Sequence, residues 1–136
     1  MSVIVTDDGF RADDWDRGFA EAEHWPSEGG ALGLDVPSDT DPARLGGKLN
    51  APIIRVDFPS FSDGRGFTIA AELRRMGYGG RLRAKGHVIA DQYAMARRAG
   101  FDEVEIDGAL AARQPEAQWR ARTDWRAHDH QGRLRA

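Results

Sequence analysis

Short apolar runs alternate with helical periods through the middle of the chain. The run 31–36 (ALGLDV) predicts a strand that Pro37 ends, and the run 52–58 (PIIRVDF), rich in β-branched residues, gives the clearest strand signal. A weaker signal covers 81–85, and at 101–106 apolar and acidic residues alternate. The pattern therefore predicts four strands.

Helical spacing follows each of the first three strands. An N-capping Asp41 before a proline predicts a short helix to about Leu49. Apolar residues at helical spacing predict helices over 67–76 and 88–98, and Pro115 can start a last helix that ends near residue 122. Strands alternating with helices predict an α/β fold of βαβ units with a mostly parallel sheet. The pattern leaves open whether this sheet is open or a barrel-like arc.

The two ends of the chain differ in charge. Residues 1–30 contain eight acidic and two basic residues, whereas residues 109–136 contain six arginines and three acidic residues. We expect an acidic, irregular and loosely docked segment over 1–30, one α/β domain over 31–122 and a basic tail over 123–136. The end segments either are simply solvated or pair with each other or with partners.

The composition excludes several classes of protein. The chain has 136 residues, of which 40% are hydrophobic, which suits a single domain with its own core. A net charge of −3 does not favour nucleic-acid binding, and the lack of cysteine excludes disulfides, thiolate nucleophiles and cysteine-bound metal or iron–sulfur centres. No metal site is expected. The absence of a long apolar run or a signal-peptide pattern predicts a cytoplasmic protein without a membrane span.

Polar residues follow the predicted strands at their carboxyl ends, where parallel α/β sheets bind ligands. The candidates for an anion site there are Asp57, Ser62, Asp63, Gly64, Arg65, Gly66, Arg83, Lys85 and His87. Backbone N–H groups at the start of the following helix and the three cationic side chains would hold an anion, while Asp57 and His87 could orient a group or move a proton. The alternative is structural, with helix capping, glycine turns and an Asp–Arg pair.

Nucleotide binding is a weaker possibility at the same loop. Gly64 and Gly66 match the first two glycines of a dinucleotide fingerprint, but Ile69 stands at the third. Arg83 and Lys85 would lie near the 2′-phosphate of NADP. No intrinsic cofactor is expected, and NADP or a flavin has only weak support.

Tryptophan and arginine near the carboxyl end suggest a partner surface, because both residue types are enriched at interface hot spots. The candidates are Trp119, Arg122, Trp125 and Arg126. The alternative is that the tryptophans hold the end segments on their own core.

One stretch of the chain resembles a known family. The sequence 57–67 (DFPSFSDGRGF), with further matching pieces between Leu73 and Phe101, resembles a bacterial family catalogued as a domain of unknown function. Genes of this family often stand beside the sulfite reductase gene, and its members carry a label that links them, as oxidoreductases, to sulfite reduction. The resemblance covers about residues 31–108 and implies a pathway but no catalytic residues.

Sulfite reduction needs a cofactor that can deliver several electrons, and a chain without cysteine cannot hold a conventional iron–sulfur cluster. We therefore expect an accessory protein of assimilatory sulfite reduction that acts with sulfite reductase or its electron donor. The alternative is a small anion- or phosphonucleotide-binding α/β enzyme, such as an NADP-linked oxidoreductase. Whether the chain is an enzyme stays open at this point.

Overall fold

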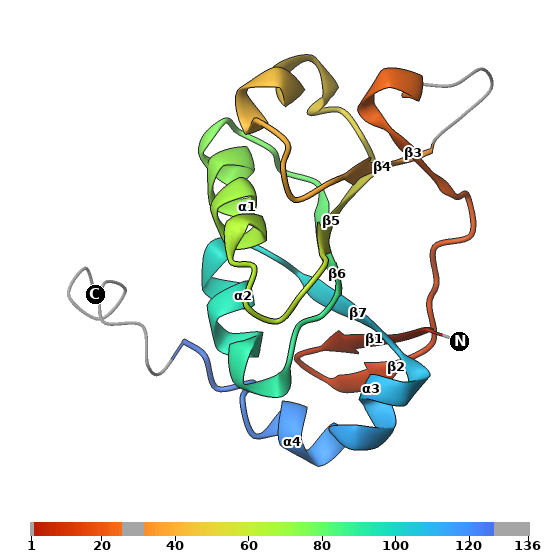
Figure 1. Cartoon of the computed structure of the whole chain (residues 1–136), viewed down its shortest axis with the longest axis vertical. Helices are drawn as coiled ribbons and strands as arrows, with labels where there is room; N and C mark the ends of the chain where they lie inside the picture. Colours follow the sequence, from red (N-terminus) through yellow and green to blue (C-terminus); the bar gives the residue numbers. More distant parts are fainter. Residues whose placement is uncertain (1, 26–31, 127–136) are drawn as a thin grey trace.

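The computed structural model describes residues 2–25 and 32–126. These residues form one seven-stranded sheet in the order β2-β1-β7-β6-β5-β4-β3 (Figure 1). The strands are β1 (Ser2–Thr6), β2 (Gly9–Arg11), β3 (Phe19–Glu21), β4 (Gly33–Val36), β5 (Ile53–Phe58), β6 (Arg81–Gly86) and β7 (Glu103–Asp107). Strands β3 to β7 run parallel, whereas β1 is antiparallel to both β2 and β7. The predicted α/β class with a mostly parallel sheet is confirmed, and the sheet is open.

The helices between the parallel strands cover one face of the sheet (Figure 1). The α-helices are α1 (Arg65–Arg75), α2 (Tyr93–Ala99), α3 (Gly108–Arg113) and α4 (Glu116–Arg120), and the 3₁₀ helices are η1 (Ala22–His24), η2 (Pro42–Lys48) and η3 (Ala90–Gln92). The predicted cap is present in η2, where the Asp41 carboxylate accepts a bond from the Ala43 N–H at 3.0 Å. Helices α1 and α2 follow β5 and β6, as the alternating pattern predicts.

The first 25 residues differ from the sequence prediction. They were expected to be irregular, but β1 pairs with β7 and β3 pairs with β4, so this segment adds strands at both sides of the predicted four. The chain between β2 and β3 passes over the sheet face opposite to α1 and α2 (Figure 1). We call residues 12–18 the N-terminal strap. Residues 26–31 and 127–136 lie outside the described part of the chain, so the predicted boundary at residue 30 and most of the predicted tail are untested.

The two faces of the sheet have opposite character because side chains alternate along each strand. Ile54, Val56 and Phe58 of β5 pack in the hydrophobic core beneath the helices. Arg55 and Asp57, the residues between them, point to the other face. The alternation explains how a strand with two charged residues can lie at the centre of the sheet.

A network of ion pairs joins the polar face to the strap. Arg83 on β6 is fully buried, and its guanidinium donates to Glu103 at 2.5 Å, to Glu105 at 2.8 Å and to Asp13 of the strap at 3.0 Å. Its neighbour Arg81 donates to Glu103 at 2.8 Å. Arg81 also donates to the strap residue Asp14 at 2.5 Å. The strap is therefore held on the sheet by charge-assisted hydrogen bonds.

These bonds predict an acid-sensitive contribution to stability. Burial alone would raise the pKa of Asp13, but the bonds from Arg83 lower it below the ordinary 3.8, and the bond from Arg81 lowers the pKa of Asp14. A carboxylate with a lowered folded-state pKa contributes stability above its unfolded-state pKa and loses that contribution as the pH falls through the folded-state value. Asp13→Asn should therefore cost about 1 to 2 kcal/mol at neutral pH and almost nothing in strong acid.

The measurement is chemical denaturation of the wild type and Asp13→Asn across the acid range. Asp16→Asn is the control, since Asp16 is an exposed strap residue with no side-chain partner among the described residues. A destabilisation that persists unchanged in strong acid, below the lowered folded-state pKa of Asp13, would show that its carboxylate does not act through its charge.

Candidate functional site

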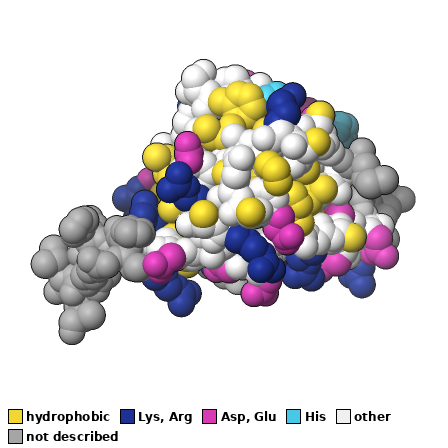
Figure 2. All heavy atoms as spheres, turned by 90° about the horizontal axis from the view of Figure 1, so that it is seen from below, with side chains coloured by type: hydrophobic (Ala, Val, Ile, Leu, Met, Phe, Trp, Pro, Cys, Tyr) yellow, Lys and Arg dark blue, Asp and Glu magenta, His cyan; other side chains and the backbone are white. Residues whose placement is uncertain are grey.

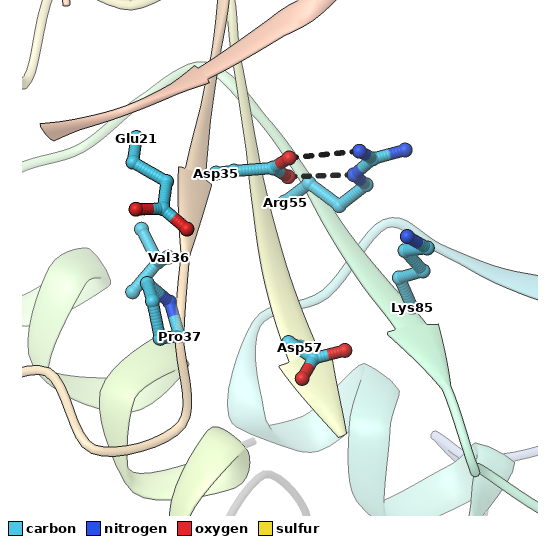
Figure 3. Close-up of a pocket in the computed structure, with 7 residues that line it drawn as sticks. All are labelled: Glu21, Asp35, Val36, Pro37, Arg55, Asp57 and Lys85. Carbon is cyan, nitrogen blue, oxygen red and sulfur yellow. Dashed lines mark hydrogen bonds and ion pairs between the residues drawn. The ribbon is translucent and has the colours of Figure 1, made fainter. Parts of the chain in front are cut away.

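The carboxyl ends of β3 to β6 enclose a polar pocket on the face opposite to the helices. The pocket has a volume of about 320 Å³. Its lining residues are Glu21, Asp35, Val36, Pro37, Arg55, Asp57 and Lys85 (Figure 3). Asp57 and Lys85 are direct neighbours across β5 and β6, so the register of the sheet places both at the same edge. This is where an α/β sheet of this topology positions a ligand site.

One wall of this polar pocket is a fixed ion pair. The Arg55 guanidinium donates to both oxygens of Asp35, from Nε at 2.7 Å and from Nη2 at 2.8 Å (Figure 3). Its Nη1 donates to Glu105 at 3.1 Å. Burial alone would lower the pKa of Arg55, but the hydrogen bonds and charge of Asp35 raise it overall. Arg55 is therefore already neutralised, and it shapes the pocket instead of offering a free positive charge.

Three other charged groups of the polar pocket have no such partner. The side chains of Lys85, Asp57 and Glu21 form no ion pair or hydrogen bond with any residue that the structure describes. Glu105 faces Lys85 in the register, but its oxygens accept from Arg55 and Arg83. The pocket thus presents one available cation and two available carboxylates.

A second, smaller pocket of about 160 Å³ lies on the other side of Lys85. Its lining residues are Ser2, Phe61, Lys85, Gly86, His87, Glu105, Ile106, Asp107, Leu110 and Arg113. The Asp107 carboxylate caps α3 by accepting from the Leu110 N–H at 2.7 Å. Glu105 is neutralised by Arg55 and Arg83, whereas Asp107 keeps its charge, because its printed partner among the described residues is a backbone N–H. The side chains of Lys85 and Arg113 in this pocket have no partner among the described residues.

The surface around these openings carries both signs of charge. Figure 2 views the molecule from below, the side to which the carboxyl ends of β5 and β6 point, and shows hydrophobic, basic and acidic side chains interspersed on that face. A surface of this kind gives no strong field of one sign, so any selectivity for a charged ligand has to come from individual side chains in the pockets.

The structure brings three of the predicted site residues together. Asp57 and Lys85 line the polar pocket, and Lys85 and His87 line the second one. The His87 imidazole lies edge-on to the Phe61 ring, with centroids 5.1 Å apart, and its Nδ1 is 3.2 Å from the Phe58 carbonyl oxygen. These residues are the predicted ones that form part of the candidate site.

The predicted loop residues lie elsewhere. Asp63 binds Arg65 through both carboxylate oxygens, at 2.9 and 2.7 Å, and the bonds from Arg65 lower the pKa of Asp63 to about 2. Arg65 also donates to Ser38 at 3.0 Å, and Ser62 bonds to Ser60 at 3.2 Å. Arg65 lines a separate pocket with residues 38–40, Pro42 and further residues of α1, so the Asp63–Arg65 pair does not join Lys85.

The two glycines of the loop are also apart from the polar pocket. Gly64 precedes α1, and Gly66 in its first turn packs against β5, where an added Cβ would lie 2.4 Å from the Phe58 ring. Residues 59–64 separate β5 from α1, which differs from the tight strand-to-helix turn of a dinucleotide site. Gly66 thus has a packing role, and binding of NADP or a flavin stays a prediction.

Arg83 does not reach either pocket. It was predicted to bind an anion together with Lys85, but its donors bond to Asp13, Glu103 and Glu105 in the buried network. Burial alone would lower the pKa of Arg83, whereas these carboxylates raise it overall. The structure therefore corrects that assignment, since Arg83 has a structural partner for each side of its guanidinium.

Of the predicted partner residues, one is buried and the other three remain accessible. Trp119 is fully buried, with its Nε1–H donating to the Gln114 carbonyl at 2.9 Å, so it is not available to a partner. Trp125 is half-buried between the guanidinium groups of Arg97 and Arg126, at 4.8 and 4.9 Å from its ring centre. Arg122 is exposed and bonds to the exposed Asp91 at 2.7 Å. Trp125, Arg122 and Arg126 remain accessible as partner residues.

Sequence reasoning missed most of the lining residues of the two pockets, among them the charged residues Glu21, Asp35, Arg55 and Arg113. Asp35 and Arg55 stand at alternate positions inside apolar strands, which is the signal that could have shown a polar sheet face. Glu21 belongs to a three-residue strand that the pattern did not predict.

Residues 33–135 match the model of a family described as bacterial proteins of unknown function, DUF934. The chain belongs to this family. The match includes β4 to β7 and all four α-helices, and it leaves out β1 to β3 and the strap, together with the pocket residues Ser2 and Glu21. The resemblance seen in the sequence is thus confirmed at the level of a bacterial family of unknown function. No curated protein and no solved structure matches the chain.

Two further findings concern residues 2–25 and 32–126. No helix there is long and apolar enough to cross a membrane. No group of three or more histidine, aspartate or glutamate side chains is arranged there so that it could hold a metal ion.

Proposed function

We propose that this chain is an accessory protein of assimilatory sulfite reduction, not its catalytic subunit, and that it binds a small anion at Lys85. The observation that carries the binding part is the half-buried residue Lys85, whose side chain lines both pockets without a side-chain partner among the described residues. A partly buried charge without a partner favours a ligand of opposite sign.

The second pocket supports an anion in particular. Arg113 adds a second available cation, and Glu105 is already neutralised by Arg55 and Arg83, so Lys85 and Arg113 stand against the single charge of Asp107, which caps α3. A tetrahedral oxyanion accepts hydrogen bonds from ammonium and guanidinium groups, which both donate and do not accept. Sulfite, sulfate and phosphate are the first anions to consider.

The pathway part rests on the family resemblance. The resemblance implies a link of the family to the sulfite reductase gene, and the 136 residues contain no cysteine that could bind an iron–sulfur cluster. An accessory role with sulfite reductase or its electron donor therefore agrees better with the composition than a catalytic one. Trp125, Arg122 and Arg126 are the proposed partner residues.

Anion binding predicts a rise in melting temperature with sulfite, sulfate or phosphate. An anion at 100 times its Kd should add about 2.7 kcal/mol to the unfolding free energy. Lys85→Gln should remove this effect without unfolding the apoprotein, because Lys85 lies at the rim of the sheet. Arg98→Gln is the control that removes an exposed charge with no partner among the described residues. An equal rise in Lys85→Gln would place the anion elsewhere.

The partner proposal predicts that this protein co-elutes with sulfite reductase from the same source on gel filtration. Trp125→Ala should weaken the complex, whereas Met95→Ala, which removes an exposed hydrophobic side chain from α2, should not. Separate elution at both low and moderate salt would contradict the accessory role and leave anion binding as the remaining function.

A further inference from the structure

Glu105 on β7 is a buried carboxylate beside the available Lys85. The two residues face each other in the β6–β7 register, and both line the second pocket. Only 6% of the Glu105 side chain is exposed, so water has little access to replace the hydrogen-bond donors that its charge requires. Asp57, the other register neighbour of Lys85, is exposed and can be hydrated. Glu105 is therefore the carboxylate that would bind Lys85 if it lost its own donors.

Two arginines now supply those donors. Nη1 of Arg83 donates to Oε1 of Glu105 at 2.8 Å, whereas Nη1 of Arg55 donates to Oε1 at 3.1 Å and to Oε2 at 3.4 Å. The Ser2 hydroxyl also donates to Oε2, at 3.4 Å. Among the described residues, Arg55 is thus the only charged donor to Oε2. Without Arg55, this buried anionic oxygen would keep a single long bond from a hydroxyl group.

We propose that Arg55 is a positioning residue of the anion site, which keeps Lys85 available by holding Glu105. Loss of Arg55 would leave Oε2 unpaired, and the Lys85 ammonium opposite would bind it and be neutralised. The forked guanidinium suits this role, because it binds Asp35 through Nε and Nη2 and Glu105 through Nη1. This inference rests on the proposed binding of an anion at Lys85 and adds the residue that governs it.

Arg55→Met tests the positioning role, because methionine keeps an apolar contact with the Phe19 ring but donates no hydrogen bond. Two measurements report on Lys85, namely calorimetric titration of sulfite and the rate of reductive methylation of the amine, read by mass spectrometry. An opposite charge in contact favours the ammonium form, which does not react. Arg55→Met should therefore bind sulfite about tenfold more weakly than the wild type and methylate Lys85 about tenfold more slowly.

A second substitution separates the capture of Lys85 from a general change of charge. Arg55→Met/Glu105→Gln should restore both measurements to within about twofold of the wild type, because a neutral amide holds an ammonium far less strongly. The matched control is Arg55→Met/Asp35→Asn, which removes the same charge, leaves Glu105 ionised and should restore neither. Asp35 has a side chain that is 33% exposed and can be hydrated when Arg55 is absent. If Arg55→Met does not fold, Arg55→Lys replaces it in each variant with the same expected pattern, because one ammonium cannot bind both carboxylates as the fork does.

Unchanged methylation of Lys85 in Arg55→Met, or equal restoration by the two double variants, would overturn the positioning role. Failure of the Glu105→Gln substitution to restore either measurement would overturn it as well, since Arg55 would then act on the pocket directly. If sulfite does not bind the wild type but the methylation rates follow the expected pattern, Arg55 still keeps Lys85 available and the proposed anion site fails. If sulfite binds the wild type and loses affinity in Lys85→Gln, while Arg55→Met changes neither measurement, the anion site stands and this inference fails.

Discussion

Replacing Arg83 by methionine is expected to destabilise the fold by about 3 kcal/mol. Arg83 is fully buried and bonds to Glu103, Glu105 and Asp13. Methionine has a similar length but no charge, so the variant keeps three carboxylates around an apolar side chain. The two glutamates are each about 5% exposed and cannot be solvated without opening the sheet. Their remaining partners, Arg81 and Arg55, limit the loss.

Denaturation in urea measures this effect. Arg75→Met is the matched control, because the Arg75 side chain on α1 is 73% exposed and, among the described residues, pairs only with Glu72 at the surface. A change there should cost within about 0.5 kcal/mol. Equal stability of the two variants would show that the buried network contributes no net stability.

Replacing Trp119 by alanine is expected to cost about 3 to 5 kcal/mol. The indole is fully buried, and its ring meets the Tyr93 ring edge-on with centroids 6.2 Å apart. Removal would leave a cavity between α4 and α2 and free the Gln114 carbonyl that now accepts the indole N–H. Thermal or chemical denaturation at constant protein concentration measures the loss.

Trp125→Ala provides the comparison. Because Trp125 is half-buried, its replacement should lower the free energy of unfolding by about 1 kcal/mol. The two tryptophan variants together also distinguish a role in core packing from a role in partner binding. If Trp119→Ala kept its stability but lost co-elution with sulfite reductase, Trp119 would be an interface residue, and the buried position in the structure would not describe the free protein.

The parallel core of the fold could be predicted because its signals are local. Strands β4 to β7 coincide with apolar or alternating runs, and glycine or proline separates them from the helices. The N-terminal strands were missed because β2 and β3 have three residues each. The pairing of β1 with β7 also joins residues about 100 positions apart, which a local pattern does not show.

Only part of the candidate site could be predicted from the sequence, because the rest depends on contacts between strands. Asp57, Lys85 and His87 follow from the rule that ligands bind at the carboxyl ends of parallel strands. Arg83 is paired with carboxylates and Lys85 is not. This difference depends on which side chains lie opposite each other on neighbouring strands, which the sequence spacing does not show. Glu103 faces Arg83 in the register, whereas Glu105, which faces Lys85, bonds to Arg55 and Arg83. Arg83 is consequently saturated and Lys85 is left available.

Calorimetric titration of sulfite into the wild type, Lys85→Gln and Lys85→Arg tests the central claim most directly. We predict one site in the wild type, binding at least about tenfold weaker in Lys85→Gln, and substantial recovery in Lys85→Arg, which restores the charge. Phosphate and sulfate titrations alongside would show which oxyanion the site prefers. Sulfite, sulfate and phosphate all failing to bind the wild type, or binding Lys85→Gln with wild-type affinity, would contradict an anion site at Lys85.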